Sequence, residues 1–326
     1  MHEIEDVLVP VDFSTFSQSA LAFARQLGDS CNSGARLHLG HAVESMPSYV
    51  RSILYPYAPL GEDDREFEAE LAESVRREMS RFFEFDDALQ ERLDGDPKVG
   101  FGAPSDCIGD WSSALDVDII SVGAFGRRGV YPGGPGSTAR RIAATATQPV
   151  ALIRDYEPEP RIERIAAAVD LGEETSNVVD VAIRLAIDQG AELELIHVIP
   201  SPYAHDTNWR VERHFDFDAD ALDDSLRPAV RRAMIDTVDA IDVTHGGGDG
   251  FEQGLREPSI AVGDPATEIG AWTTARDVDL LVFGSGRIST SQPSGLGRVA
   301  SAIMAGVARH QVVVPSGPAV APLDRK

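Results

Sequence analysis

Lysine is almost absent from this chain of 326 residues. Only Lys98 and Lys326 occur, so arginine supplies the rest of the 29 basic residues, which face 53 acidic ones. The net charge of −24 is spread along the whole sequence and repels polyanions, which argues against nucleic acid and anionic membranes as partners. An acid-rich, lysine-poor composition predicts a halophilic protein, because high salt screens the repulsion.

Cysteine, long apolar runs and a leader are also scarce or missing. The two cysteines, Cys31 and Cys107, lack the spacing of metal ligands, and we predict that both are buried thiols. No apolar run approaches the ~18 residues of a membrane span. The acidic start of the chain, residues 1–6, has none of the features of a signal peptide. We therefore expect a cytoplasmic protein.

Motifs of hydrolases and of common nucleotide enzymes are missing as well. The sequence has no Gly-x-Ser-x-Gly, no Cys/His pair of the catalytic type and no His-Glu-x-x-His. It also lacks the P-loop and the Gly-x-Gly-x-x-Gly fingerprint. The Asp-x-Asp pairs at 116–118 and 277–279 precede predicted strands, where we interpret them as helix ends and turns. We predict no catalytic residue and no metal site.

The sequence contains an internal repeat. Several features recur at a constant offset of 161 positions, among them the pairs Gly102 and Gly263, Trp111 and Trp272, Asp116 and Asp277, and Gly123 and Gly284. A fixed offset of this kind indicates two copies of one domain. We predict domains at residues 1–155 and 161–316, a short proline-containing linker between them and a disordered tail, 317–326.

Each copy alternates short apolar runs with amphipathic segments. In the first copy the predicted strands are Val7–Val11, Leu37–His41, Val99–Phe101, Ile119–Val122 and Val150–Ile153. One predicted helix begins after Ser14, and the others cover Glu62–Leu93, Ser105–Leu115 and Ala139–Thr147. Strand–helix alternation predicts the α/β class: two copies of a doubly wound, five-stranded parallel sheet, Rossmann-like, with helices on both faces.

The stretch "GAFGRRGVYPGGPGST", residues 123–138, follows a predicted strand and precedes a predicted helix. Ligands of open parallel sheets bind at the carboxyl ends of strands where the strand order reverses. Glycines there allow a close approach of the main chain, and the first turn of the helix offers free amides to an anion. Ser137 and Thr138 add hydroxyl donors. The loop therefore predicts a phosphate site.

The spacing Gly123-x2-Gly126-x9-Gly136-Ser137, together with "VLVPVDFSTFSQSALAFA" near the N-terminus, resembles the universal stress protein family. The likeness covers nearly all of both halves and implies an adenine nucleotide alpha hydrolase-like fold. It also implies ATP as ligand, and because the chain is so acidic we expect the triphosphate to arrive with Mg²⁺ or Mn²⁺. On the family pattern Asp12 accepts a hydrogen bond at the adenine end, and Pro10, Val11 and Ala42 line the base pocket. On the same pattern, the ribose and phosphates are held by Gly123, Gly126, Gly136, Ser137 and Thr138.

The second copy departs from this pattern, because Gly297 is followed by Arg298 and not by a hydroxyl residue. The resemblance implies a regulatory protein that binds an adenine nucleotide in its first domain, the second being structural or partner-facing. A slow ATPase or adenylate-transferring enzyme, and a scaffold without nucleotide, are the alternatives. We expect an internal pseudo-dimer in which Val150–Ile153 pairs with Val312–Val314, and a homodimer stays open.

Overall fold

A computed structural model describes residues 4–28, 34–44, 64–127, 129, 134–155, 161–200, 219–245, 254–286 and 295–316. The chain divides into two compact units between residues 160 and 161, which we call the first and second domains. Cys31, the linker residues 156–160 and the tail 317–326 lie outside the described residues. The predicted domain ends at 155 and 316, and the expected pairing of Val150–Ile153 with Val312–Val314, stay predictions.

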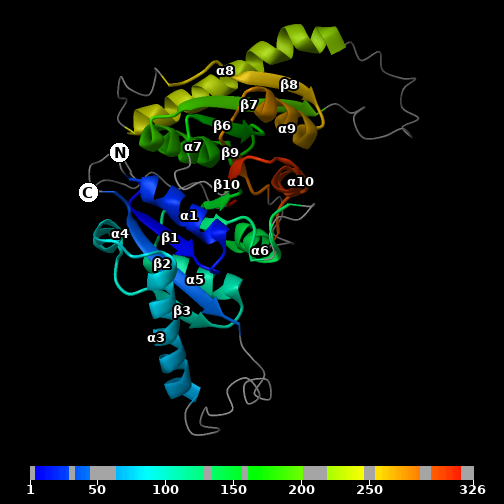
Figure 1. The fold of residues 1–326 in the computed structure, drawn as a ribbon. Helices are drawn as coiled ribbons and strands as arrows, with labels where there is room; N and C mark the ends of the chain where they lie inside the picture. The colour runs from blue at the N-terminus through cyan, green and yellow to red at the C-terminus, as the bar shows by residue number, and fades with distance from the viewer. Residues whose placement is uncertain are drawn as a thin grey trace, which may run out of the picture. The chain divides into compact units, whose positions relative to one another are not determined.

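The first domain is a parallel sheet of five strands in the order β3-β2-β1-β4-β5. Figure 1 labels β1, β2 and β3 of this sheet. Its strands are β1 (Asp6–Pro10), β2 (Arg36–Val43), β3 (Lys98–Phe101), β4 (Ile119–Gly123) and β5 (Val150–Ile153). Its helices are α1 (Thr15–Gln26), α3 (Asp64–Phe82), α4 (Asp87–Arg92), α5 (Pro104–Leu115) and α6 (Ser137–Thr145).

The second domain repeats this plan with the order β8-β7-β6-β9-β10, again parallel. Its strands are β6 (Arg164–Val169), β7 (Glu192–Pro200), β8 (Ser259–Gly263), β9 (Leu280–Gly284) and β10 (His310–Val314). Its helices are α7 (Thr175–Gln189), α8 (Ala219–His245), α9 (Pro265–Ala275) and α10 (Arg298–Gly306). The predicted fold class is confirmed in both halves.

Helices cover both faces of the first sheet. The hydroxyl of Ser121 in β4 donates to the carbonyl of Ala20 in α1 over 2.8 Å. On β2, a side chain at Gly40 would place its Cβ 2.5 Å from the ring of Trp111 in α5. The strand register puts positions 40 and 121 on opposite faces, so α1 and α5 sandwich the sheet. Residues 7–9 of the central strand are consequently fully buried.

The Asp-x-Asp pairs have the structural role that the sequence predicts. Asp116, after α5, is left-handed with φ +50°, and Asp277 is left-handed with φ +53°. The Asp118 carboxylate accepts the amides of Glu5 and Asp6 at 2.8 and 3.0 Å. In the second domain Asp279 accepts two amides at the start of β6 in the same way. The first aspartate ends a helix, and the second positions the first strand of the domain.

Three expectations need correction. The predicted helix Glu62–Leu93 is two helices, because α3 ends at Phe82 and Asp86 caps α4 through a 2.7 Å bond from the Leu89 amide. The helix predicted at Ala139 begins at Ser137. Cys107 is only partly buried, next to the small residue Gly100.

Among the described residues, no helix has the length and apolarity to cross a membrane.

Candidate functional site

The predicted site residues come together at one edge of the first sheet. Pro10 is the last residue of β1, and Val11 and Asp12 follow it directly. Ala42 is near the end of β2, and Gly123 ends β4. Because β1 and β4 are neighbours from which the strand order runs in opposite directions, this edge is the switch point of the sheet.

Pro10 limits the pairing of β1 with β4. The main-chain N–H and C=O groups of alternate β1 residues point toward β4. Asp6 is one of these residues, because its carbonyl accepts the Asp118 amide at 2.9 Å. Pro10 lies on that side and has no N–H to donate. The register of β1 with β4 accordingly ends at Leu8 and Ile120, short of the carboxyl edge.

The second domain lacks this interruption. Ala168 stands where the first domain has Pro10, and the pairing of β6 with β9 continues to Ala168 and Phe283. In the first domain the last positions of β1 and β4 pair with β2 and β5 but not with each other. Main-chain groups that face the gap between β1 and β4 are thus free of pairing at the carboxyl edge, whereas β6 and β9 stay paired there.

Asp12 is held in a tight turn. Its Oδ1 accepts the Ser14 amide at 3.0 Å and the Ser17 hydroxyl at 2.6 Å. Phe13 between them is left-handed with φ +59°, a conformation that costs a residue with a side chain roughly 1–2 kcal/mol. Ser14 also caps α1 by accepting the Ser17 amide. The carboxylate is therefore oriented before any ligand arrives.

The second carboxylate oxygen of Asp12 lies over the glycine loop. A Cβ at Gly126 would come 2.9 Å from Asp12 Oδ2, which is closer than side chains tolerate. Asp12 itself is exposed at the edge of the sheet. The lack of a side chain at position 126 thus keeps Oδ2 in place and open to solvent.

The other two predicted loop glycines have evident packing roles. A Cβ at Gly123 would lie 2.7 Å from Cβ of Phe16, so this glycine lets α1 approach β4. The Gly136 amide donates to the Ala124 carbonyl at 2.8 Å and is not available to an anion. Ser137 and Thr138 follow it as the exposed first residues of α6, where helix amides have no partner within the helix.

Three residues outside the predicted site surround Asp12. His41 Nδ1 lies 2.6 Å from the Val11 carbonyl, and its ring contacts Phe13 with centroids 4.9 Å apart. The Arg127 Nε donates to the Asp12 carbonyl at 2.6 Å, with its guanidinium over the Phe13 ring. Burial lowers the pKa of His41; the Val11 carbonyl opposes this, and Arg127 adds to it. The histidine is therefore favoured in its neutral form.

The second domain keeps the turn that holds the strand-end aspartate. Asp170 Oδ1 accepts the Gly172 amide at 2.8 Å and the Thr175 hydroxyl at 3.2 Å, and Leu171 has φ +60°. His197 Nδ1 lies 2.8 Å from the Val169 carbonyl, which repeats the contact of His41 with Val11.

The helix after the second glycine loop differs in its first turn. The Gly297 amide donates to the Ser285 carbonyl at 2.8 Å, which matches the bond between Gly136 and Ala124. Arg298 and Val299 then occupy the places of Ser137 and Thr138. This match also puts Gly286 at the position of Phe125, so in the sequence Gly126 corresponds to Arg287, which lies outside the described residues.

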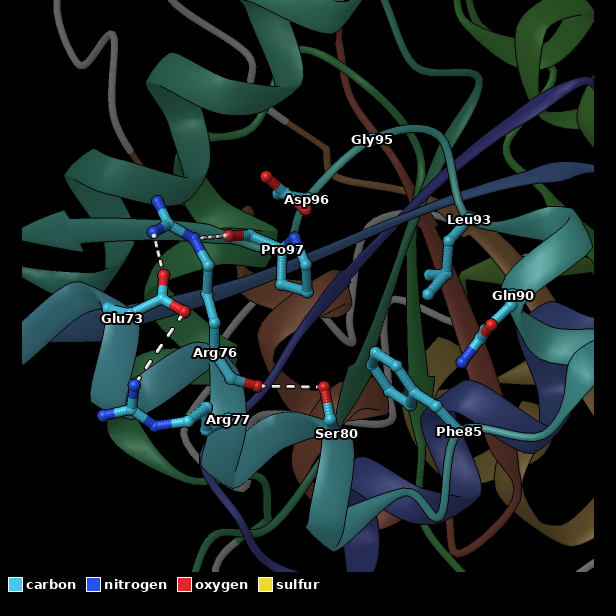
Figure 2. Close-up of a pocket in the computed structure, with 10 residues that line it drawn as sticks. All are labelled: Glu73, Arg76, Arg77, Ser80, Phe85, Gln90, Leu93, Gly95, Asp96 and Pro97. Atoms are coloured by element: carbon cyan, nitrogen blue, oxygen red, sulfur yellow. Dashed lines mark hydrogen bonds and ion pairs between the residues drawn. The ribbon is translucent and has the colours of Figure 1, made fainter.

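A hollow of about 410 Å³ in the first domain lies away from this edge, between α3, α4 and the segment before β3 (Figure 2). Arg76 and Arg77 both pair with Glu73, and Arg76 Nε donates to the Pro97 carbonyl at 3.0 Å. Phe85 and Leu93 lie across from them. Both arginines of the hollow already pair with Glu73. We therefore interpret the hollow as a packing gap between α3 and α4 and not as a binding site.

Comparison with known proteins matches both halves of the chain to one family. The model of the "Universal stress protein family" matches residues 3–154 and again 161–315. A solved universal stress protein from Archaeoglobus fulgidus DSM 4304 is 18% identical, with 96% of this chain and 98% of that chain covered and a TM-score of 0.58.

Two structures from Pseudomonas aeruginosa also match over 96% of this chain at 15% identity. One is a functionally unknown protein from strain PAO1, with 92% of it covered and a TM-score of 0.57. The other is a putative universal stress protein from strain UCBPP-PA14, with 93% covered and a TM-score of 0.54. At these identities the likeness shows the fold. A comparison with curated proteins gives no match.

Proposed function

The chain belongs to the universal stress protein family, and from this premise we propose that its first domain binds ATP at the carboxyl edge between β1 and β4. The observation that carries the proposal is the Asp12 carboxylate, fixed through Oδ1 by Ser14 and Ser17 and open at Oδ2 above Gly126. One oriented carboxylate oxygen suits a purine amine or a ribose hydroxyl.

The remaining residues fit the other parts of the nucleotide. The apolar surface for the base comes from Pro10, Val11 and Ala42. The first turn of α6, with Ser137 and Thr138, supplies hydroxyls and unpaired amides for the phosphates. Gly123, Gly126 and Gly136 keep the main chain close to this region. Because the chain is so acidic, the triphosphate would arrive as a complex with Mg²⁺ or Mn²⁺.

We assign the second domain a structural or partner-facing role. It lacks the hydroxyl pair after its loop, and its switch-point strands stay paired to Ala168. The nucleotide then acts as a conformational ligand, whose effect depends on its binding one arrangement better than another. The acidic, lysine-poor composition supports a salt-rich cytoplasm as the place where it acts.

Calorimetric titration of the full chain with Mg-ATP in molar KCl tests the proposal. We expect one site per chain and a loss of affinity of about 10- to 100-fold in Asp12→Asn, because a hydrogen bond to a charged group contributes about 1.5–3 kcal/mol. Asp170→Asn, the same change in the second domain, is the matched control and keeps full affinity.

Three results would contradict the proposal in different ways. Equal weakening in both variants would place the nucleotide in both domains, and no heat with the wild-type chain would favour the scaffold. Phosphate release that scales with protein concentration would favour the slow ATPase. Lys98, the one lysine inside the chain, lies at the start of β3 and therefore at the opposite edge from α6, which argues against its acting on phosphate.

A further inference from the structure

The amino edge of the first sheet, opposite the proposed nucleotide site, holds three potential metal ligands. Asp6 opens β1, His38 lies in β2, and Asp94 follows α4. One ligand atom from each lies within 4.8 Å of the others. Asp94 is held beside β2 because its amide donates to the Leu37 carbonyl at 3.1 Å.

His38 is the centre of this group. Its side chain is only 2% exposed, and its Nε2 lies 2.8 Å from Asp6 Oδ1. Arg36 Nε donates to the same carboxylate at 2.9 Å, which keeps Asp6 ionised and makes it the acceptor of the Nε2 proton. The other ring nitrogen, Nδ1, then carries a lone pair.

That lone pair faces a negative charge. His38 Nδ1 lies 3.8 Å from Asp94 Oδ2 and has no hydrogen-bond partner among the residues that the structure describes. A buried nitrogen lone pair aimed at a carboxylate is unfavourable unless a proton or a metal ion lies between them, and 3.8 Å is too long for a hydrogen bond through a proton. A tetrahedral metal with ordinary bond lengths to nitrogen and oxygen separates the two atoms by about 3.4 Å. The exposed Asp94 side chain can close that small difference by rotating.

We propose that His38 Nδ1 and the Asp94 carboxylate bind a divalent first-row metal of the zinc or cobalt type. Imidazole nitrogen favours these ions over Mg²⁺ and Ca²⁺, which prefer oxygen ligands. Asp6 acts through the other ring nitrogen, as carboxylates behind metal-bound histidines do, by fixing the tautomer and the ring orientation. Water completes the coordination on the solvent side of Asp94.

The second domain holds different charges at the same place. The bridge of Leu193 with Leu255 repeats that of Leu37 with Leu93, and the Arg256 amide donates to the Leu193 carbonyl as Asp94 does to Leu37. By this register, Arg164, Glu194 and Arg256 replace Asp6, His38 and Asp94.

The charges at these positions are thus reversed and satisfied internally. Arg256 pairs with Glu192, which occupies the place of Arg36. Glu194 accepts the Ser259 hydroxyl at 2.6 Å and pairs with Arg276 at 3.1 Å. Arg256 at the place of Asp94 and Arg164 at the place of Asp6 repel a cation, so we expect one metal site per chain, in the first domain.

Titration of the full chain with Co²⁺ and with Zn²⁺, without nucleotide, tests this inference. We expect one saturable site, seen as cobalt d–d absorption and as heat on zinc addition, and a thermal midpoint that rises with Zn²⁺. Affinity falls at least tenfold in His38→Gln and in Asp94→Asn. The exposed neighbour Glu91 supplies the control, Glu91→Gln, which binds like wild type.

Asp94→Asn keeps the test decisive if the buried His38 variant fails to fold, because the Asp94 side chain is 59% exposed. The absence of a saturable site in the wild type would overturn the inference. Binding that survives unchanged in Asp94→Asn would overturn it as well, since the metal would then lie elsewhere in the chain.

Discussion

The Asp12 carboxylate leaves room only for glycine at position 126. Asp12 Oδ1 is fixed by two hydrogen bonds, so Oδ2 cannot swing aside without breaking them. A Cβ at 126 would lie 2.9 Å from Oδ2. The glycine is therefore explained by the position of a side chain more than 100 residues earlier, and not by the flexibility of its loop.

Gly126→Ala should displace the Asp12 carboxylate with little effect on folding. We expect ATP affinity to fall about tenfold, the equivalent of about 1.4 kcal/mol, with an unchanged unfolding midpoint. Gly109→Ala, inside α5 where an added Cβ meets no atom within 4 Å, is the control. It should stabilise the protein by about 1 kcal/mol and leave binding intact. Wild-type affinity in Gly126→Ala would contradict the role of Oδ2.

His41 should make stability depend on pH. Its pKa is lowered from 6.5 in the folded chain, chiefly by burial, so the unfolded chain binds the proton first as the pH falls. Stability is then complete above about pH 6.5 and declines below it. Urea unfolding at about pH 7.5 and about pH 5.5 should show a smaller decline in His41→Gln, which keeps a donor for the Val11 carbonyl but does not titrate. An equal decline would show that other groups cause it.

The sequence predicts some residues of these sites and not others, for a physical reason. Asp12, Gly126, Ser137 and Thr138 belong to contiguous motifs, and local spacing places them at strand and helix ends. The metal-ligand group has no such signal, because Asp6, His38 and Asp94 come from separate elements and meet only through strand register. Our expectation that the chain has no metal site rests on short spacings in the sequence and stays a prediction, which the proposed metal titration tests.

Among the elements, strands are easier to predict than the helices between them. Buried parallel strands are continuous apolar runs, so all five of the first domain appear at nearly their observed bounds. The break between α3 and α4 is invisible to periodicity, because apolar residues continue through it. It depends on Glu84, left-handed with φ +47°, and on the cap at Asp86, and neither residue is unusual in a charged helix.

The strand pair at the switch point can be tested by exchanging its key residue. Ala168→Pro removes an N–H that faces β9 and should destabilise the protein by about 1 kcal/mol or more, measured by urea unfolding. Pro10→Ala supplies the missing N–H in the first domain. There we expect slower hydrogen exchange at residue 10 than at exposed amides, and weaker ATP binding. Rapid exchange at residue 10 would show that proline is not what ends the pairing.

For the molecule as a whole, charge is the dominant property. A net charge of −24 repels itself when unscreened, and the Debye length shortens from about 10 Å at 0.1 M salt to about 3 Å at 1 M. We expect the thermal midpoint to rise by at least about 2 °C over that range of KCl. The rise should shrink near about pH 4.3, where glutamates are half protonated. A midpoint independent of salt at neutral pH would refute the halophilic interpretation.

The turn at Asp170, Leu171 and Gly172 has a practical consequence for protein engineering. The second domain still holds its strand-end carboxylate and its left-handed residue, although its loop has diverged. On the function that we propose, this turn is the part of a nucleotide site that the second domain retains. We expect Arg287→Gly, Arg298→Ser and Val299→Thr, with Ala168→Pro to release the strands, to give the second domain the site proposed for the first.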